Sequence, residues 1–281
     1  MNKNTFKTSI LLAALGGMLV LIGGVLFRGA GALIGLAVGL LFVGASYWFS
    51  DKIAIKAARA QPVSEQEAPD LYRMVRELTT AANMPMPRLY VTPDPQPNAF
   101  ATGRDDRHAA VAVTQGITEL LSPDELRGVL AHELSHVKHR DILIGSVAAA
   151  IAMGITFIAR MLMWGAMFGG DDDDGGNPLG LLALAILAPM AAALLQMAVS
   201  RSREFEADRG AAGLIGSGEP LAGALEKLQA AAHRVPMDVN PAQASMYIVN
   251  PLSGRSANFA RLFSTHPPAE ERISRLRNWR P

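Results

Sequence analysis

Cysteine is absent from the sequence. Disulfide bonds, thiol catalysis and thiolate-ligated zinc are therefore excluded, and histidine and carboxylate side chains remain as the ligands for a zinc ion. Charged residues are also scarce, at 18% of the 281 residues, whereas hydrophobic residues make up 50%. This balance is more typical of a membrane protein than of a soluble domain.

The sequence also lacks the basic character of a nucleic-acid-binding protein. Its formal net charge is only +1, and no tract of basic residues interleaved with aromatic residues is present. Because binding to a phosphate backbone needs a clustered positive charge, we expect no nucleic-acid partner.

Four long apolar runs account for the hydrophobic content. Each is about the length that an α-helix needs to cross ~30 Å of hydrocarbon, so the sequence predicts two hairpins of membrane-spanning helices. Lys3 and Lys7 ahead of the first run would also suit a secretory signal, but no small-residue cleavage site follows and a second run begins at once. The expected spans are residues 9–27, 30–49, 142–168 and 179–199.

Basic residues gather on one side of this four-span arrangement. The opposite loops carry Arg28, Arg160 and an acidic loop at 169–178. Because lysine and arginine are enriched on the cytoplasmic side of membrane proteins, the segments between the hairpins are predicted to face the cytoplasm. The basic residues on that side are Lys3, Lys7, Lys52, Lys56, Lys138, Arg140, Arg201 and Arg203.

A His-Glu-x-x-His motif occupies residues 132–136. Positions four apart lie about 40° apart around a helix, so His132 and His136 project from one face and can bind one ion. Glu133 beside them can accept a proton from a metal-activated water that attacks a carbonyl. The motif indicates metal-dependent hydrolysis, although five such residues also arise by chance on amphipathic helices.

A third ligand is available downstream. Catalytic zinc takes three protein ligands and one open position, and Glu204 and Asp208 lie on one face of a second predicted helix. One of them can bind the metal while the other holds a ligand imidazole. The metzincin pattern is excluded, because residue 139 is histidine rather than glycine and residue 142 is Ile142. We interpret His139 as a bystander.

The motif helix has a clear start. Ser122-Pro123-Asp124-Glu125 forms a capping box with proline at the first helical position, so the helix is predicted to begin at Pro123. No stop signal follows, and the helix is expected to run on into the apolar residues from Ile142. The metal site would then lie close to the membrane surface.

A small sheet is predicted before this helix. Residues 88–92 suggest one strand, and residues 98–102 can pair with 108–113. An exposed edge of such a sheet can bind an extended substrate as an added strand. Asn98 and Ala99 are either ordinary hairpin residues or substrate-binding residues. His266, before a last helix at 268–278, either belongs to a helix-start loop or stabilises the oxyanion.

These motifs together resemble the HtpX family of bacterial membrane zinc metalloproteases, related to the Ste24-type CAAX-prenyl peptidases. The resemblance spans nearly the whole chain and includes Asn-Ala-Phe-Ala-Thr-Gly at 98–103, Ser-Arg-Ser-Arg-Glu-Phe-Glu-Ala-Asp at 200–208 and Ser-Thr-His-Pro-Pro at 264–268. It departs from the expected pattern at Glu206, where histidine would be usual.

The resemblance implies one Zn²⁺ per chain held by His132, His136 and Glu204, with Glu133 as the catalytic carboxylate. It supports less strongly a role for Asp208 behind the ligands and for His266, Asn98 and Ala99 at the substrate or oxyanion. The implied protein is a multi-pass inner-membrane endopeptidase that cleaves misfolded or damaged membrane proteins at the cytoplasmic face. Its partners are unfolded polypeptides and the lipid bilayer.

The expected fold is a mainly α membrane protein with a small β-sheet, in which a zincin-like domain is carried on four transmembrane helices. Three alternatives are an intramembrane protease, a non-catalytic scaffold and a prenyl-protein peptidase. The charged residues that follow the motif disfavour the first, because charge is costly within a bilayer. The expected parts are 1–50 and 142–200 as membrane hairpins, and 51–141 and 201–281 as cytoplasmic segments.

Overall fold

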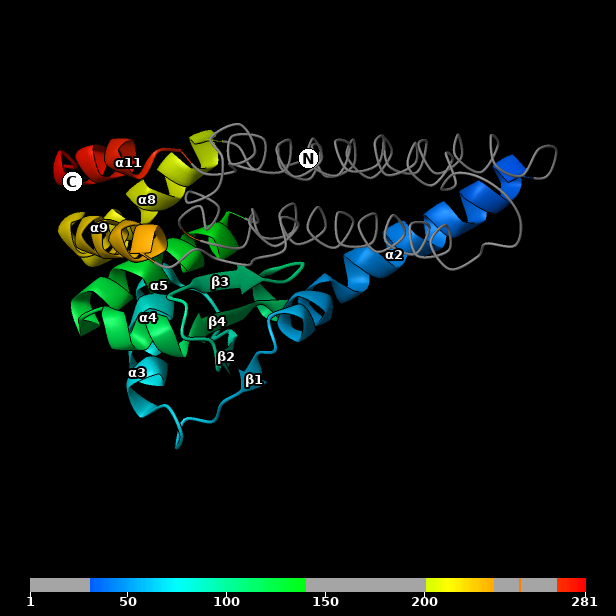
Figure 1. Ribbon diagram of the computed structural model, residues 1–281, viewed down its shortest axis with the longest axis horizontal. Coiled ribbons are helices and arrows are strands. Elements are labelled where there is room, and N and C mark those ends of the chain that lie inside the picture. The colour runs from blue at the N-terminus through cyan, green and yellow to red at the C-terminus, as the bar shows by residue number, and fades with distance from the viewer. Residues whose placement is uncertain (1–30, 140–200, 235–247, 249–266) are drawn as a thin grey trace, which may run out of the picture.

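The computed structural model describes residues 31–139, 201–234, 248 and 267–281, and helices predominate in them. The expected spans 9–27, 142–168 and 179–199, the acidic loop 169–178 and His266 lie outside these residues. Within the described part, no helix combines the length and the apolar character needed to cross a membrane. The helices are α2 (Gly31–Ala57), α3 (Pro69–Ala82), α4 (Gln115–Leu120), α5 (Pro123–Lys138), α8 (Arg201–Ile215), α9 (Glu219–Arg234) and α11 (Ala269–Arg277). In Figure 1 most of the helices lie beside a small sheet, whereas α2 extends away from it and only its end comes near.

The sheet is mixed and has the strand order β1-β2-β4-β3. The predicted pairing of the second and third strands is confirmed, because β3 (Ala99–Thr102) runs antiparallel to β4 (Ala110–Thr114). The predicted strand at 88–92 is also present as β2 (Arg88–Thr92), and it lies parallel to β4. The short β1 (Gln61–Pro62) completes the sheet. Consequently β4 is central and fully buried, whereas β3 forms an edge.

Helix α5 begins where the sequence predicts. The side chain of Ser122 accepts a hydrogen bond from the backbone of Glu125, the side chain of Glu125 accepts one from the backbone of Ser122, and Pro123 occupies the first turn. These interactions satisfy backbone N–H groups that would otherwise have no partner at a helix start. They fix the first residue of the helix that carries the metal-binding motif.

The expected continuation of this helix past residue 140 was wrong. Helix α5 ends at Lys138, and His139 caps it with φ −84° and ψ 1°, outside the helical range of ψ. One turn earlier, the hydroxyl of Ser135 donates to the carbonyl oxygen of Ala131, a contact that tends to bend helices. The motif is therefore carried by the last turns of a helix of 16 residues.

The main core lies between one face of the sheet and helices α3, α5, α8 and α9. Val129, Leu130 and Leu134 of α5 are completely buried in it. Helices α5 and α9 approach closely at Gly128, where an added Cβ atom would lie 2.6 Å from the backbone nitrogen of Leu221. This approach requires glycine and fixes α5 against the C-terminal helices.

The opposite face of the sheet is covered by the end of α2. Ala54 packs with Phe100 and Ala112 in a separate small core. Helix α2 runs through the expected boundary at residue 50, and Asp51 pairs with Arg88 of β2 at 2.7 Å. The end of this helix is therefore attached to the sheet.

Candidate metal centre

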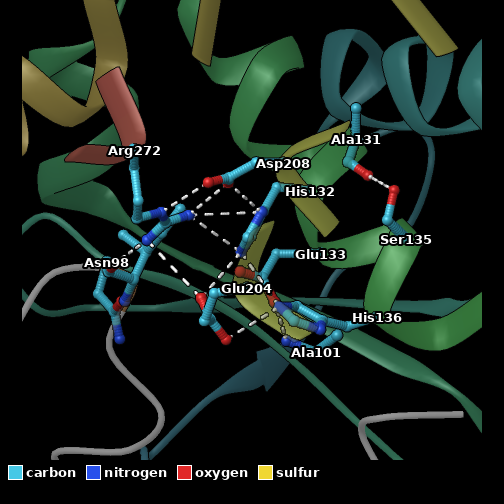
Figure 2. A network of polar contacts seen from close by, with 11 residues as sticks. Asn98, Ala101, Ala131, His132, Glu133, Ser135, His136, Glu204, Asp208 and Arg272 are labelled. Atoms are coloured by element: carbon cyan, nitrogen blue, oxygen red, sulfur yellow. Dashed lines mark hydrogen bonds and ion pairs between the residues drawn. The ribbon is translucent and has the colours of Figure 1, made fainter. Parts of the chain in front are cut away.

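Three side chains converge where α5 packs against α8. The Nε2 atoms of His132 and His136 lie 3.1 Å apart, and carboxylate oxygens of Glu204 lie 3.7 Å and 3.5 Å from them. Among the described residues, this is the one group of histidine and carboxylate ligands close enough to share an ion. Figure 2 shows the carboxylate of Glu204 facing both imidazoles.

These distances fit a tetrahedral zinc ion. Ligand atoms about 2.0–2.1 Å from the metal at tetrahedral angles lie roughly 3.3 Å from one another, close to the 3.1, 3.5 and 3.7 Å found here. The two imidazole Nε2 atoms face each other and the carboxylate of Glu204. All three groups can donate an electron pair to a metal ion. The residues therefore fit zinc in both geometry and chemistry.

Asp208, one turn beyond Glu204 on α8, contacts the imidazole of His132. Oδ1 of Asp208 lies 3.0 Å from Nδ1 of His132, so Nδ1–H donates to the carboxylate and Nε2 keeps its lone pair for the metal. The spacing of Glu204 and Asp208 places both carboxylates on the face that contacts α5. Each therefore meets a different nitrogen of the same imidazole.

Residues 65–280 match the model of peptidase family M48, and they contain all of these groups. The chain belongs to peptidase family M48. It is 54% identical over 279 residues to the protease HtpX homolog of Syntrophobacter fumaroxidans, an alignment that covers 97% of this chain and 98% of that protein. It is 55% identical over 277 residues to the protease HtpX homolog of Pelotomaculum thermopropionicum, with 97% and 98% covered.

The fold of this chain is also similar to that of a solved structure. The crystal structure of Ste24p from S. mikatae superposes with a TM-score of 0.53 at 20% sequence identity. The alignment covers 97% of this chain and 65% of that one, so the present chain spans about two thirds of its length. At this identity the likeness shows a shared fold.

His132, His136 and Glu204 are thus the zinc site of an M48 metalloprotease. The set predicted from the sequence is brought together as expected. His139, predicted to be a bystander, does not belong to the ligand group and is exposed at the end of α5.

Arg272 of α11 lies behind the M48 site. Its guanidinium donates to both carboxylate oxygens of Asp208, at 2.7 and 2.9 Å, and to the carbonyl oxygen of Ile248 at 3.0 Å. It also lies 3.7 Å from Glu204 and 3.4 Å from Nε2 of His132. Figure 2 shows the guanidinium facing both side chains. Arg272 is therefore a positioning residue that acts on His132 through Asp208.

Burial and these contacts set the protonation states behind the metal. Burial by itself raises the pKa of Asp208, but Arg272 and the hydrogen bond from His132 lower it to about 2. Burial lowers the pKa of His132, and the charge of Arg272 adds to this effect while Asp208 opposes it. Burial also lowers the pKa of Arg272, yet Asp208 raises it overall. The result is a neutral imidazole, which is the form that binds metal.

Arg272 was not among the predicted site residues, although its position in the sequence carries a signal. On α11, Arg272, Ile273 and Leu276 are buried at spacings of one, three and four residues. A charged residue within the buried stripe of an amphipathic helix must have a buried partner. That reasoning finds the position of Arg272, but the partner Asp208 is 64 residues away.

The remaining predicted site residues occupy two places. Glu133 lies beside the ligands, and its Oε2 accepts a hydrogen bond of 2.9 Å from the backbone N–H of Ala101 in β3. Asn98 and Ala99 are both buried at the start of the same strand. The amide oxygen of Asn98 accepts a hydrogen bond of 3.3 Å from the backbone N–H of Ile248, and this bond fixes the Asn98 side chain.

Replacing Arg272 with methionine is expected to weaken zinc binding by about 10–100-fold, the usual cost of losing a partner behind a ligand. Asp208 would lose both hydrogen bonds from the guanidinium and would hold His132 less firmly. Zinc affinity should be measured by competition with a chromogenic chelator. The control is Arg277→Met on the exposed side of the same helix, which loses only surface ion pairs. Equal zinc affinities in the two variants would contradict the positioning role.

Proposed function

We propose that this M48 metalloprotease is a membrane-bound endopeptidase that cleaves misfolded or damaged membrane proteins at the cytoplasmic face, with Glu133 as the catalytic carboxylate. The observation that carries the proposal is the position of Glu133. Its carboxylate lies between the metal ligands and the edge strand β3. The residue is buried, with only 7% of its surface exposed.

When bound, zinc supplies Lewis acidity, which makes a water molecule more acidic and polarises a peptide carbonyl. Glu133 accepts a proton from the attacking water and passes it to the leaving amine nitrogen. The water oxygen bonds to the carbonyl carbon, the C–N bond breaks, and Glu133 returns to its starting state. Ala101 holds one oxygen of Glu133, and the other oxygen makes no hydrogen bond within the described residues, so it can accept the proton.

The substrate is proposed to bind along β3. Within the described residues, β3 pairs on one side only, with β4. The backbone N–H of Ala101 points away from β4 toward Glu133, so Ala99, two residues earlier, presents its backbone to the same open side. An extended peptide can pair with this edge, and only unfolded segments have backbone available for such pairing. This requirement supports unfolded chains as the substrate class.

Location at a membrane is supported by the apolar runs and by helix α2. His136 is six residues from the start of the apolar run at Ile142, a distance of at most about 20 Å along the chain. Leu41 and Trp48 of α2 are exposed, which suits a helix in contact with lipid. His266 remains a candidate for oxyanion stabilisation in this proposal.

Removal of the metal tests the function directly. The purified protein, reconstituted in lipid with an unfolded membrane protein as substrate, should lose activity by roughly 10³-fold after chelation, because the polarisation of the carbonyl contributes several kcal/mol. Stoichiometric zinc should restore cleavage. Equal rates on casein and on the membrane substrate would argue against membrane proteins as the preferred class, whereas cleavage that resists chelation would contradict the metal mechanism.

A further inference from the structure

A cationic cavity lies at the edge of the sheet opposite the zinc site. It has a volume of about 480 Å³ and is formed by the last turns of α2 together with β1 and β2. The zinc site adjoins β3, and β1 and β3 are the two opposite edges. Figure 1 shows α2 reaching the sheet near β1. The proposed catalytic mechanism does not use this cavity.

The cavity has more positive than negative charge. Four cationic side chains and one carboxylate line it, and Asp51 is paired with Arg88 at 2.7 Å. Three cations are then left for a ligand. Within the described part of the chain, Lys56 and Arg59 form no ion pair, and Lys52 lies 5.4 Å from the centre of the Phe49 ring. The cations are Lys52, Lys56, Arg59 and Arg88.

Arg59 occupies a position that favours glycine. The N–H of Ala60 donates to the carbonyl of Ile55, and the N–H of Arg59 donates to the carbonyl of Lys56. This is a Schellman motif, and Arg59 has the left-handed φ of 52° that glycine normally provides. A non-glycine residue there costs free energy, and the cationic side chain gains no ion pair in return. Such local strain suggests a functional use of the side chain.

The helix that leads into the cavity identifies the ligand. Leu41, Trp48 and Phe49 of α2 are 75%, 57% and 49% exposed. Exposed aromatic residues one turn before a group of cations are typical of the boundary between hydrocarbon and lipid headgroups. A phospholipid whose phosphate lay in the cavity would have its acyl chains alongside these apolar residues. We propose that the cavity binds the phosphate of an anionic phospholipid headgroup, an inference that rests on the proposed membrane location.

Tyr90 and Gln61, which carry a hydroxyl and an amide, are also among the lining residues. These groups can donate neutral hydrogen bonds to phosphate oxygens, while Lys56 and Arg59 supply charge. The cations at the helix end also interact with the helix dipole. The C-terminal end of a helix carries the equivalent of about half a negative charge. It therefore offsets only a small part of the positive charge in the cavity, and most of that charge is available to the ligand.

The test uses Trp48 as a reporter in the full-length protein. Trp164 and Trp279 are replaced with phenylalanine, so that Trp48 is the one remaining tryptophan. The protein is reconstituted with phosphatidylcholine or phosphatidylglycerol whose acyl chains carry bromine, which quenches tryptophan. Stronger quenching by brominated phosphatidylglycerol than by brominated phosphatidylcholine, decreasing as salt rises, is the expected result.

Lys56→Gln with Arg59→Gln should reduce the preference for phosphatidylglycerol by about 25-fold, or about fivefold for each cation near an anionic surface. Arg209→Gln with Arg280→Gln removes the same charge from exposed positions outside the cavity and should leave the preference unchanged. Arg59→Gly provides a variant that folds without the local strain, and it should be more stable yet show a preference about fivefold weaker.

Equal quenching by the two lipids in the Trp48 reporter protein with its cavity residues intact would overturn the headgroup site while leaving the membrane location intact. Absence of quenching by either lipid would overturn both. Inorganic phosphate is added in a third arm, at an ionic strength held constant with chloride. If it reduced the preference for phosphatidylglycerol, free phosphate and the headgroup would compete for the cavity, as the proposal expects. A site for free phosphate alone would instead show no preference between the two lipids in the absence of added phosphate.

Discussion

Glu133→Gln is expected to reduce the rate of peptide cleavage by roughly 10²–10⁴-fold, the usual contribution of a positioned general base. Glutamine has nearly the same shape as glutamate and can still accept the hydrogen bond from Ala101 through its amide oxygen. It cannot accept a proton from water at neutral pH. The variant should therefore fold, keep the geometry of β3 and fail only in proton transfer.

Zinc content separates this result from simple loss of the site. Since Glu133 is not one of the three ligands, Glu133→Gln should retain one zinc per chain by metal analysis. The same measurement on Glu77→Gln, an exposed glutamate on α3 that pairs only with surface arginines, controls for the loss of one charge. Cleavage by Glu133→Gln at the original rate would remove Glu133 from the mechanism.

The local features of the fold follow from short stretches of sequence. The start of α5 was predictable because Ser122, Pro123 and Glu125 all act within one turn. The pairing of β3 with β4 was predictable because the two strands follow each other in the sequence and are joined by a short connection. His132 and His136 were predictable as ligands because their helical spacing alone places them together.

Features that depend on distant contacts were not predictable in this way. The parallel pairing of β2 with β4 joins strands separated by β3, and no local pattern specifies it. The end of α5 at Lys138 was missed because no glycine or proline marks it and His139 caps the helix by its backbone conformation. Arg272 was missed because its partners lie on α8 and at Ile248.

The charges at the zinc site explain why these distant contacts are required. Among the ion pairs seen in the described residues, the site brings together three carboxylates, Glu133, Glu204 and Asp208, with the guanidinium of Arg272. Three negative charges and one positive charge give a net charge of −2, which Zn²⁺ neutralises. Buried charges are costly unless they are paired, so zinc stabilises the contact between α5 and α8, and Arg272 offsets part of the charge when zinc is absent.

Glu204→Ala is therefore expected to remove the link between zinc and stability. If the ~10–16 kcal/mol of tight four-ligand zinc sites is shared equally, loss of one ligand costs about 2.5–4 kcal/mol, or roughly 70–900-fold in affinity. In detergent, zinc should raise the unfolding midpoint of the unsubstituted protein by roughly 5–15 °C when present at 100–1,000 times its dissociation constant. The same zinc concentration should leave Glu204→Ala almost unchanged.

Glu206→Ala is the matched control, because Glu206 lies two residues away on the same helix and is exposed. It loses the same carboxylate and should keep the full zinc-dependent rise. Glu133→Gln should keep the rise as well while cleaving peptide far more slowly, which separates metal binding from proton transfer in one set of measurements. A zinc-dependent rise in Glu204→Ala equal to that of Glu206→Ala would show that the ion is held without Glu204, and the coupling of α8 to the metal would be refuted.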